Sequence, residues 1–599
     1  MEGGAFELRS ERLGPLPLIN HFTARLGLEE ILDRAVPTSD PRCALTYATR
    51  LGVLLRSIVC EREPIYRLGE VVLTYAPEGF SLAPEEAARI TDDMCGRALD
   101  RLFDADRGSL LTEMVIATAE RFSLSLAELH NDSTTVKFCG QYARARGRSI
   151  RGKRAPFITY GYSKDRRPDL KQLLFILTST ADGGVPVMFR CEAGNASDSR
   201  THEETWEALV RACGRSDFLY VADGKLCNED ALDYIDRHGG RLVTVLPRSR
   251  IEDRLFREWV QDHEPAWEKA IDRENPRGKG LPRDRWFVWR HHLPSGEGWP
   301  VTWVLSSLLR AHQTQARADR IASAAQELDD LARREMGPRA RKRSRYEVQR
   351  AIDDILERWR VARYVKVSLH AVPEHTFRQE RPGRPGPDTK FVRKTKLKWE
   401  ITWALDEAAI AYDRRSDGMY PLLTNDRSLT PRQVLEAHKR QPVIEKRFSQ
   451  VKSVLEIAPV LLKDEGRIEA LFFLYFIGLL ICTLIERELR KAMEREGIED
   501  IPLYPEERPN HRPTSEQIFR LFSLVERHTL LENGREVQRF EPDLTDLQRQ
   551  VLAVKGGIKM YQKRRFKIVG SKASKVSLWS EWPFLCLALT SPSTGSYLL

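Results

Sequence analysis

The sequence has 599 residues, too many for one hydrophobic core, and at roughly 150 residues per domain it indicates about four structural units. Hydrophobic residues make up 41% and charged residues 30%, which excludes a disordered chain. There are 96 Lys and Arg against 86 Asp and Glu, and the net charge of +10 favours a polyanionic partner, most often nucleic acid. A soluble basic enzyme without such a partner fits the same composition.

The cysteines and the apolar runs narrow the class further. The nine cysteines lie at positions 43, 60, 95, 139, 191, 213, 227, 482 and 586. None forms a Cys-x-x-Cys pair, so we expect reduced thiols in a cytosol and no zinc site. The first residues have no apolar stretch typical of a signal peptide. The most apolar run, Ala470 to Ile485, is short for a membrane span and indicates a buried helix.

Residues 1 to about 125 carry apolar positions at helical spacing, and the pattern then changes to strands mixed with helices. The predicted strands are 126–136, 173–178, 185–190, 218–222 and 242–246, and the predicted helices between them are 201–215 and 228–238. Asp182-Gly183-Gly184 indicates a tight turn between the second and third strands. The order predicts an α/β layer in which a hairpin leads into parallel strands, as in an RNase H-like core.

The next stretch, from about 250 to 425, is less regular, and we interpret it as an insertion into this core. Helices are predicted at 308–334 and 346–359, and a half-buried strand at Trp399 to Leu405. Between them, Pro373 to Lys396 is rich in Pro, Gly and Arg and is expected to form a mobile loop. Thr430 and Pro431 then start a helix, and Pro442 starts another.

Three acidic residues are candidates for chemistry. Asp132 lies on the first predicted strand, where a carboxylate is costly unless it is paired or binds metal, although it could also cap a loop. Asp223 follows the fourth strand at the edge where ligands gather in α/β sheets, although Asp-Gly is also ordinary turn chemistry. Glu445 lies beside the apolar stripe of a predicted helix, where an exposed Glu is common.

Taken together, Asp132, Asp223 and Glu445 predict a hard oxygen site. Two aspartates on neighbouring strands and a glutamate on a returning helix can converge on one point. Such a site suits Mg²⁺ or Mn²⁺ and disfavours zinc. Two ions there can activate a water or hydroxyl and stabilise the leaving oxygen of a phosphodiester.

Seven motifs occur in one order over about residues 1–490 and carry a resemblance. They are HNDSTT at 130–135, YGYSKD at 160–165, RPDLKQ at 167–172, GNASD at 194–198, ADG at 222–224, DG at 417–418 with LTN at 423–425, and QPVIEKRF at 441–448 with Lys452. The chain resembles DDE transposases of the hairpin-forming insertion-sequence-four superfamily, in the branch with a long helical N-terminal domain.

The resemblance implies catalytic, metal-binding roles for Asp132, Asp223 and Glu445, with two Mg²⁺ ions for which Mn²⁺ substitutes, and a phosphate contact by Lys452. It implies a helical DNA-binding domain at 1–125, an RNase H-like core at 126–250 and 428–495 with the catalytic Glu helix in its second part, a mixed α+β insertion at 251–427, and a helical C-terminal region at 496–599.

The sequence departs from the superfamily pattern at two positions. The Tyr seven residues and the Arg four residues before the Glu are here His438 and Gln441. Arg440 or Arg447 is expected to supply the missing cation, and His438 to contact DNA. The hairpin intermediate is therefore less firmly implied than cutting itself.

Basic clusters indicate DNA handling through phosphate contacts, although solvated loops have the same composition. One cluster consists of Arg144, Arg146, Arg148, Arg151, Lys153 and Arg154, of which Arg148, Lys153 and Arg154 are our DNA-binding candidates. A second consists of Arg339, Arg341, Lys342, Arg343 and Arg345, and a third of Lys555, Lys559, Lys563, Arg564, Arg565 and Lys567. The Trp residues of the insertion could stack on a flipped base, but core packing is the commoner role.

The expected activity is metal-dependent cleavage of transposon ends followed by strand transfer into target DNA. The expected partners are double-stranded DNA with terminal inverted repeats, target DNA and a second copy of the chain, with no membrane, in a bacterial cytoplasm. The alternatives are an RNase H-like nuclease that does not join ends and an inactive repressor derived from a transposase.

Overall fold

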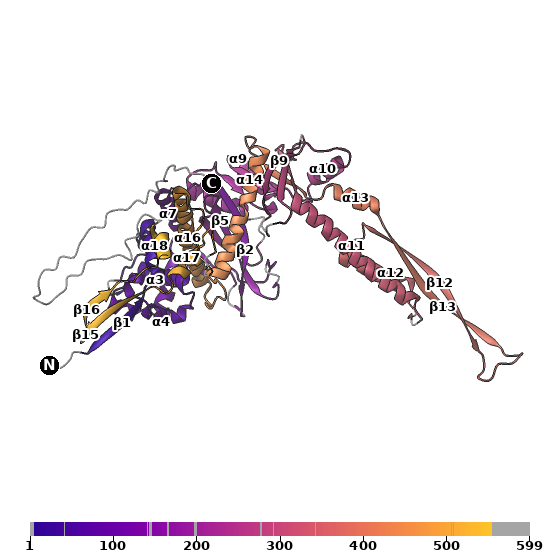
Figure 1. The fold of residues 1–599 in the computed structure, drawn as a ribbon, viewed down its shortest axis with the longest axis horizontal. Helices are drawn as coiled ribbons and strands as arrows, with labels where there is room; N and C mark the ends of the chain where they lie inside the picture. Colours follow the sequence, from indigo (N-terminus) through magenta and orange to yellow (C-terminus); the bar gives the residue numbers. More distant parts are fainter. Residues whose placement is uncertain are drawn as a thin grey trace, which may run out of the picture.

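The computed structural model describes residues 5–553 except positions 41, 141, 143–145, 165–166, 197–200, 276–277, 279, 292, 339, 342, 505 and 507. The molecule has a body, formed by the N-terminal and C-terminal thirds of the chain around a central sheet, and an arm that projects from one end of that sheet (Figure 1). The mixed α/β class predicted from the sequence is confirmed.

The central sheet has nine strands in the order β6-β5-β2-β7-β8-β14-β11-β10-β9. Its first half consists of β2 (Glu128–Phe138), β5 (Lys171–Thr180), β6 (Pro186–Ala193), β7 (Leu219–Val221) and β8 (Arg241–Val245). β5 runs antiparallel to both β2 and β6, whereas β7 is parallel to β2 and β8 is parallel to β7. The helices α8 (His202–Cys213) and α9 (Glu229–Arg237) connect β6 to β7 and β7 to β8. The predicted hairpin and parallel strands are therefore present.

The second half of the sheet comes from the region expected to be an insertion. It consists of β9 (Glu268–Arg273), β10 (Asp284–Arg290), β11 (Val301–Ser306) and β14 (Met419–Thr424), which are antiparallel to their neighbours, and β14 pairs with β8. α10 (Ile251–Asp262) precedes these strands. This part of the region continues the core sheet, while the arm leaves the sheet after β11 and returns to it at β14.

The arm consists of α11 (Ser307–Met336), α12 (Arg345–Trp359), β12 (Val365–Gln379), β13 (Phe391–Leu405) and α13 (Glu407–Arg415). It has its own small core, in which Leu328, Ile352 and Trp399 are buried. The mobile loop expected at Pro373 to Lys396 is wrong, because β12 and β13 pair from Val365 opposite Leu405 to Gln379 opposite Phe391. A two-stranded ribbon has only edge strands, which tolerate a proline that lacks an N–H group.

The N-terminal region is mainly helical and packs around one long helix. Its elements are α1 (Leu16–Leu26), α2 (Leu28–Ala35), α3 (Tyr47–Cys60), α4 (Leu68–Leu73), α5 (Pro84–Ala87), α6 (Asp92–Asp104) and α7 (Arg107–Phe122). The long helix, α16 (Glu465–Glu496), contacts α3, α6 and β6. Among the helices of the described residues, α16 alone is long and apolar enough to cross a membrane, and 89% of its most apolar stretch is buried inside the protein. The predicted buried helix is therefore present.

The two ends of the described chain meet in a second, three-stranded sheet. β1 (Phe6–Arg12) pairs with β15 (Glu526–Glu532), which pairs with β16 (Arg535–Phe540), so the order is β1-β15-β16. The remaining elements are the short ribbon β3 (Ser149–Ile150) and β4 (Lys153–Arg154), and the helices α14 (Pro431–Arg440), α15 (Pro442–Ser449), α17 (Ser515–Phe522) and α18 (Asp546–Ala553). The basic run predicted from Lys555 onward lies outside the described residues.

Candidate active site

Strand register brings Asp132 and Asp223 to the same level of the sheet. The parallel pairing of β2 with β7 ends at His130 opposite Val221, and each aspartate lies two residues further along its own chain. Because side chains alternate along a strand, both carboxylates point to the face used by His130 and Val221. Asp223 keeps an extended backbone, and its carboxylate accepts a hydrogen bond from the Lys225 backbone at 3.1 Å.

Glu445 reaches the same region from a helix. α14 ends at Arg440, and α15 restarts at Pro442, which lies in the first turn of a helix, where a missing N–H costs nothing. α15 packs against β2 and β5, with Ile444 and Phe448 buried and Glu445 exposed. The helix that carries Glu445 therefore lies on the strand that carries Asp132.

The pKa of Asp132 reflects the nearness of the two other carboxylates. Burial raises the pKa of Asp132, and the negative charges of Asp223 and Glu445 raise it further. The opposing influences are the ammonium group of Lys164, 3.7 Å from the carboxylate, and the Ser133 backbone N–H, which donates at 2.7 Å. The two other carboxylates are thus close enough to act on Asp132.

Lys164 is a site residue to which the sequence analysis gave no role. It belongs to the 160–165 motif, and its ammonium group also donates to the Ser133 hydroxyl at 2.7 Å. The motif was a usable signal, but nothing in its spacing shows that this lysine returns to the strand of Asp132. The structure therefore adds a cation beside the first aspartate.

The donor set fits a hard divalent cation in its chemistry, because three carboxylates without thiols or several imidazoles provide oxygen ligands. Within the described residues, however, no group of three or more His, Cys, Asp or Glu is close enough to hold a metal ion. The three carboxylates thus converge without reaching one coordination sphere. Joint metal binding therefore requires a change of side-chain conformation or of the elements that carry these residues.

An ion-pair chain fixes the end of α14 to β2. Arg440 donates to both carboxylate oxygens of Glu128, at 2.7 and 2.6 Å, and His130 makes a 2.8 Å contact with the same carboxylate. Although burial acts to raise it, these hydrogen bonds lower the pKa of Glu128 to about 2. Arg440, expected to contact DNA, is thus held beside the site, with its side chain 42% exposed.

His438 stands at the position where the resemblance implies a tyrosine. Burial, together with the positive charge of Lys439, lowers the pKa of His438 to about 4, so the imidazole is neutral near pH 7. Its ring lies 5.8 Å from the ring of Tyr420. A neutral imidazole can form a hydrogen bond with a phosphate, but it does not supply the charge that a cationic contact needs.

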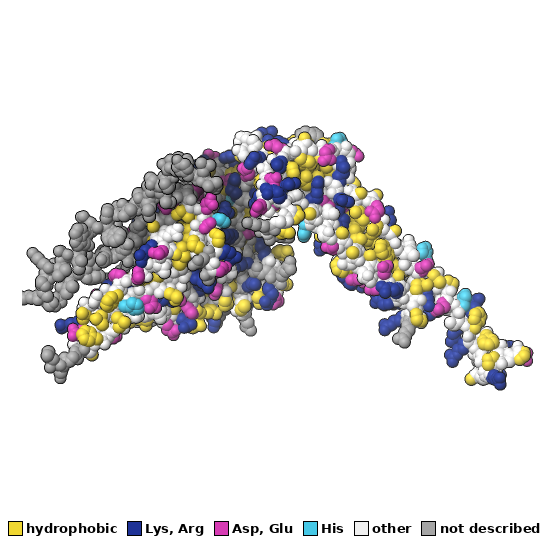
Figure 2. All heavy atoms as spheres, viewed as in Figure 1, with side chains coloured by type: hydrophobic (Ala, Val, Ile, Leu, Met, Phe, Trp, Pro, Cys, Tyr) yellow, Lys and Arg dark blue, Asp and Glu magenta, His cyan; other side chains and the backbone are white. Residues whose placement is uncertain are grey.

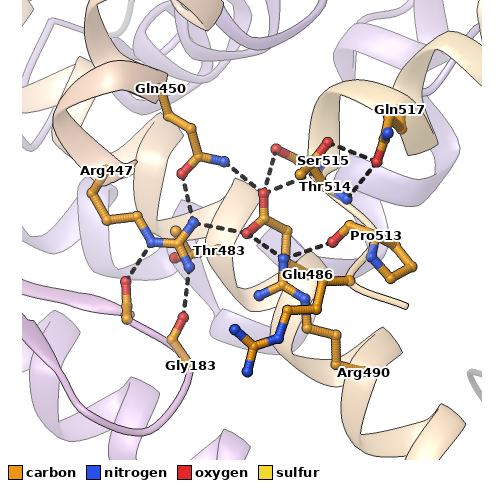
Figure 3. Close-up of polar contacts among 12 residues, drawn as sticks. Gly183, Arg447, Gln450, Thr483, Glu486, Arg490, Pro513, Thr514, Ser515 and Gln517 are labelled. Carbon is orange, nitrogen blue, oxygen red and sulfur yellow. Dashed lines mark hydrogen bonds and ion pairs between the residues drawn. The ribbon is translucent and has the colours of Figure 1, made fainter. Parts of the chain in front are cut away.

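Arg447 was expected to contact DNA, and the structure corrects this expectation because the side chain is buried. Its side chain is only 2% exposed, and it forms a 2.7 Å ion pair with Glu486 of α16 (Figure 3). It also donates to the carbonyls of Gly184 at 2.8 Å and Gly183 at 2.6 Å, in the turn between β5 and β6. With every side of the guanidinium engaged in the interior, Arg447 has no surface for DNA and instead anchors α15.

The remaining basic candidates lie at the β3–β4 ribbon or in the turn that follows α15. Arg148 is 3.7 Å from Glu465, and Lys153 donates to the carbonyl of Ala105, so both are engaged with neighbouring elements. Arg154, on β4, is exposed. Lys452 lies half-buried in the π-helical turn Gln450–Val454 that follows α15. Arg144, Arg339 and Lys342 lie outside the described residues.

Two tryptophans of the expected insertion, Trp303 and Trp286, are used in packing. Trp303 is buried and stacks on Phe256 with ring centroids 3.5 Å apart. Trp286 lies between two cations, with Arg273 4.7 Å and Lys439 4.4 Å from its ring centroid. These contacts favour the structural role for both residues.

A known protein family matches the part of the chain that forms this site. The sequence model of the family described as "Transposase DDE domain" matches residues 129–481, more than half of the chain. The chain belongs to the transposase DDE domain family. Asp132, Asp223 and Glu445 all lie within the matched region, which supports a transposase function. Residues 8–116 match a domain of unknown function (DUF4277). No curated protein matches the chain.

The extent of the DDE domain agrees with the layout of the fold. The match begins on β2 and ends within α16, so it contains the whole central sheet and the arm. The DUF4277 match begins within β1 and ends within α7. The chain thus combines a DDE domain with a helical partner that packs against its last long helix.

Proposed function

We propose that this protein is a bacterial cut-and-paste DNA transposase of the insertion-sequence-four superfamily, with an RNase H-like core. The observation that carries the proposal is the placement of Asp132 and Asp223 two residues beyond the last paired residues of adjacent parallel strands, with the Glu445 helix packed on the first of them. The strand order β6-β5-β2-β7-β8, with β5 antiparallel, is the arrangement expected of that core.

In the proposed reaction, Asp132, Asp223 and Glu445 would hold two Mg²⁺ ions, for which Mn²⁺ would substitute. Bound ions of this kind polarise the phosphodiester, activate a water or hydroxyl and stabilise the leaving oxygen. Lys164 keeps Asp132 oriented and offsets part of the repulsion among the carboxylates. Glu445 completes the site by a shift of α15, which the helix break at Gln441 and Pro442 permits.

The proposed partners are DNA with terminal inverted repeats, target DNA and a second copy of the chain, in the cytoplasm of a bacterium. Cutting and joining two transposon ends in one event requires two active sites, so a dimer is the proposed working form. The N-terminal helical region is the proposed reader of the terminal repeats, with a helix entering the major groove. Lys452 is the proposed phosphate contact beside the site.

The test is to incubate the full chain with Mg²⁺, a DNA fragment that ends in the element's own repeats, and supercoiled plasmid as target. Joined products support the proposal. Cleavage without joining overturns it in favour of an RNase H-like nuclease. Binding to the ends without cleavage, in Mg²⁺ and in Mn²⁺, overturns it in favour of a repressor that has lost activity.

A further inference from the structure

The arm ends in a basic ribbon that nothing in the proposed site uses. β12 and β13 pair over fifteen residues each, so the ribbon is about 50 Å long at roughly 3.3 Å per residue. Figure 1 shows that its outer part extends beyond the end of α12 and α11. We refer to residues 377–394, the outermost turn of this ribbon, as the arm tip.

The arm tip carries a concentrated positive charge. Its six cations, against two acidic residues, are Arg378, Arg381, Arg384, Lys390, Arg393 and Lys394, and all six are exposed. Among the described residues, none of the six has an ion-pair partner. Cations nearer the base are held in place, since Lys398 pairs with Glu374 at 2.8 Å and Lys366 pairs with Asp406 at 2.8 Å. The positive charge at the tip is therefore available to a partner.

Strand pairing sorts the tip residues by face. Phe377 lies opposite Arg393, and Gln379 lies opposite Phe391, so both phenylalanines share one face with Arg393. Arg378 and Lys394 lie on the other face. Phe377 is 66% exposed and Phe391 is 53% exposed, so this face of the tip presents two aromatic rings to solvent. Figure 2 shows these classes of side chain, hydrophobic and basic, together at the far end of the arm.

We propose that the arm tip binds double-stranded DNA by inserting the β12–β13 ribbon into a groove, outside the active site. A two-stranded ribbon fits the major groove, which is about 12 Å wide. Cations on both faces meet phosphates on both sides of the groove, and the two phenylalanines contact sugars and base edges between them. The inference rests on the proposed function for its choice of DNA, and it gives the transposase a contact distant from the cutting site.

The test compares two variants with equal loss of charge. The tip variant is R378Q/R393Q/K394Q. The matched control is R333Q/R358Q/K366Q, also on the arm, whose three cations are exposed but paired with Asp330, Glu327 and Asp406. Binding of the full chain to a fluorescent 40-base-pair duplex without terminal repeats is measured by anisotropy in EDTA, over a series of KCl concentrations. Circular dichroism and Tm confirm folding.

The tip variant should bind at least tenfold more weakly at 0.1 M KCl, and its plot of log affinity against log salt should be shallower by about two to three, at about 0.9 per lost phosphate contact. The control should stay near wild type. Equal losses in both variants, or an unchanged slope in the tip variant, overturn the proposal, as does loss of self-association with DNA binding intact. A second variant that replaces residues 380–390 with Asn-Gly should show the same loss.

The outcome separates this inference from the proposed function. If wild type cuts no DNA in Mg²⁺ but the slope difference persists, the proposed reaction fails and the arm contact stands. If wild type cuts and joins ends while the tip variant binds like wild type, the arm inference alone fails.

Discussion

Arg447 and Glu486 form a 2.7 Å ion pair in the interior, with the arginine side chain 2% exposed and the glutamate side chain fully buried. Gln450 donates to the same carboxylate at 2.6 Å, and the Ser515 backbone donates at 2.9 Å (Figure 3). Although burial acts to raise it, the positive charges of Arg447 and Arg490 lower the pKa of Glu486. The network joins α15, α16, α17 and the β5–β6 turn. Its member on α15, Arg447, lies two residues after Glu445.

Replacing Arg447 with Met should therefore destabilise the protein by about 3–5 kcal/mol, because it leaves a buried carboxylate without its partner. Equilibrium urea denaturation measures the effect. The control is Arg237→Gln, which breaks the exposed pair with Asp233 and should cost less than about 1 kcal/mol. If R447M and R237Q unfold at the same urea concentration, the network does not stabilise the fold.

Asp132→Asn, Asp223→Asn and Glu445→Gln should each abolish cutting of end DNA, because each removes a proposed metal ligand. The loss should exceed about a hundredfold, the upper range for residues that only orient a ligand. Gel-based cleavage in Mg²⁺ measures it, and end binding should stay intact. Glu436→Gln is the matched control, since Glu436 pairs with Arg432 on the exposed side of α14. Cutting by E445Q together with its loss in E436Q would show that the assignment is wrong.

The raised pKa of Asp132 has a consequence for stability. Between its ordinary and raised pKa the native state binds more protons than the unfolded state, so stability falls as pH rises through the folded pKa. Asp132→Asn should thus raise Tm at pH 7 in EDTA, and the gain should vanish near pH 3. Differential scanning calorimetry at both pH values measures this. The predicted sign is contradicted if the Tm of D132N minus the Tm of wild type is smaller at pH 7 than at pH 3.

Lys164 lowers the pKa of Asp132 from the position it would otherwise take. Lys164→Gln should therefore move the acid limb of the cleavage rate to higher pH, because the carboxylate must lose its proton before it binds metal. Lys164→Arg should restore the limb in part, since it keeps the charge. Single-turnover rates from pH 5 to 9 measure the shift. A uniform fall in rate with an unmoved limb would leave Lys164 with a purely structural role.

Glu128 changes the stability of the fold with pH in the opposite direction to Asp132, because its pKa is lowered and not raised. Its pKa falls from 4.5 to about 2, so the ion pair stabilises the fold above pH 4.5 and is lost as pH falls toward 2. At about 1.4 kcal/mol per pKa unit, Glu128→Gln should cost about 1–3 kcal/mol at pH 7. Urea denaturation at pH 7 and pH 3 measures the difference, which should shrink at the lower pH. An equal effect at both values would exclude the ion pair as its source.

Local patterns were enough to place both aspartates but not the residues that act across long distances. Asp132 lies within the first strand and Asp223 follows the fourth, and both strands are visible in the sequence. Arg447 looks like a surface cation beside Glu445, because its partners, the Gly183 carbonyl and Glu486, lie 264 and 39 positions away. Gly183 and Gly184 have φ values of 81° and 65°, which the Asp-Gly-Gly turn predicts, but no pattern shows which side chain their carbonyls accept from.

The arm shows the opposite failure. Pro, Gly and Arg between Pro373 and Lys396 suggested an unstructured segment, because those residues are rare in central strands. A ribbon with two edge strands accepts them, and its register comes from pairing between residues up to 40 positions apart, as for Val365 and Leu405. The composition of the segment thus agrees with its solvent exposure. It did not predict the extended, paired backbone of the two strands.

The pairing of β1 with β15 ties residue 6 to residue 532, across almost the whole described chain. During synthesis the first strand therefore waits, with its backbone groups unpaired, until more than five hundred further residues have been made. A chain that stops before Glu526 leaves an open strand edge, which favours aggregation. Such a chain would keep β1 as an unpaired strand that can pair with β1 of another truncated copy.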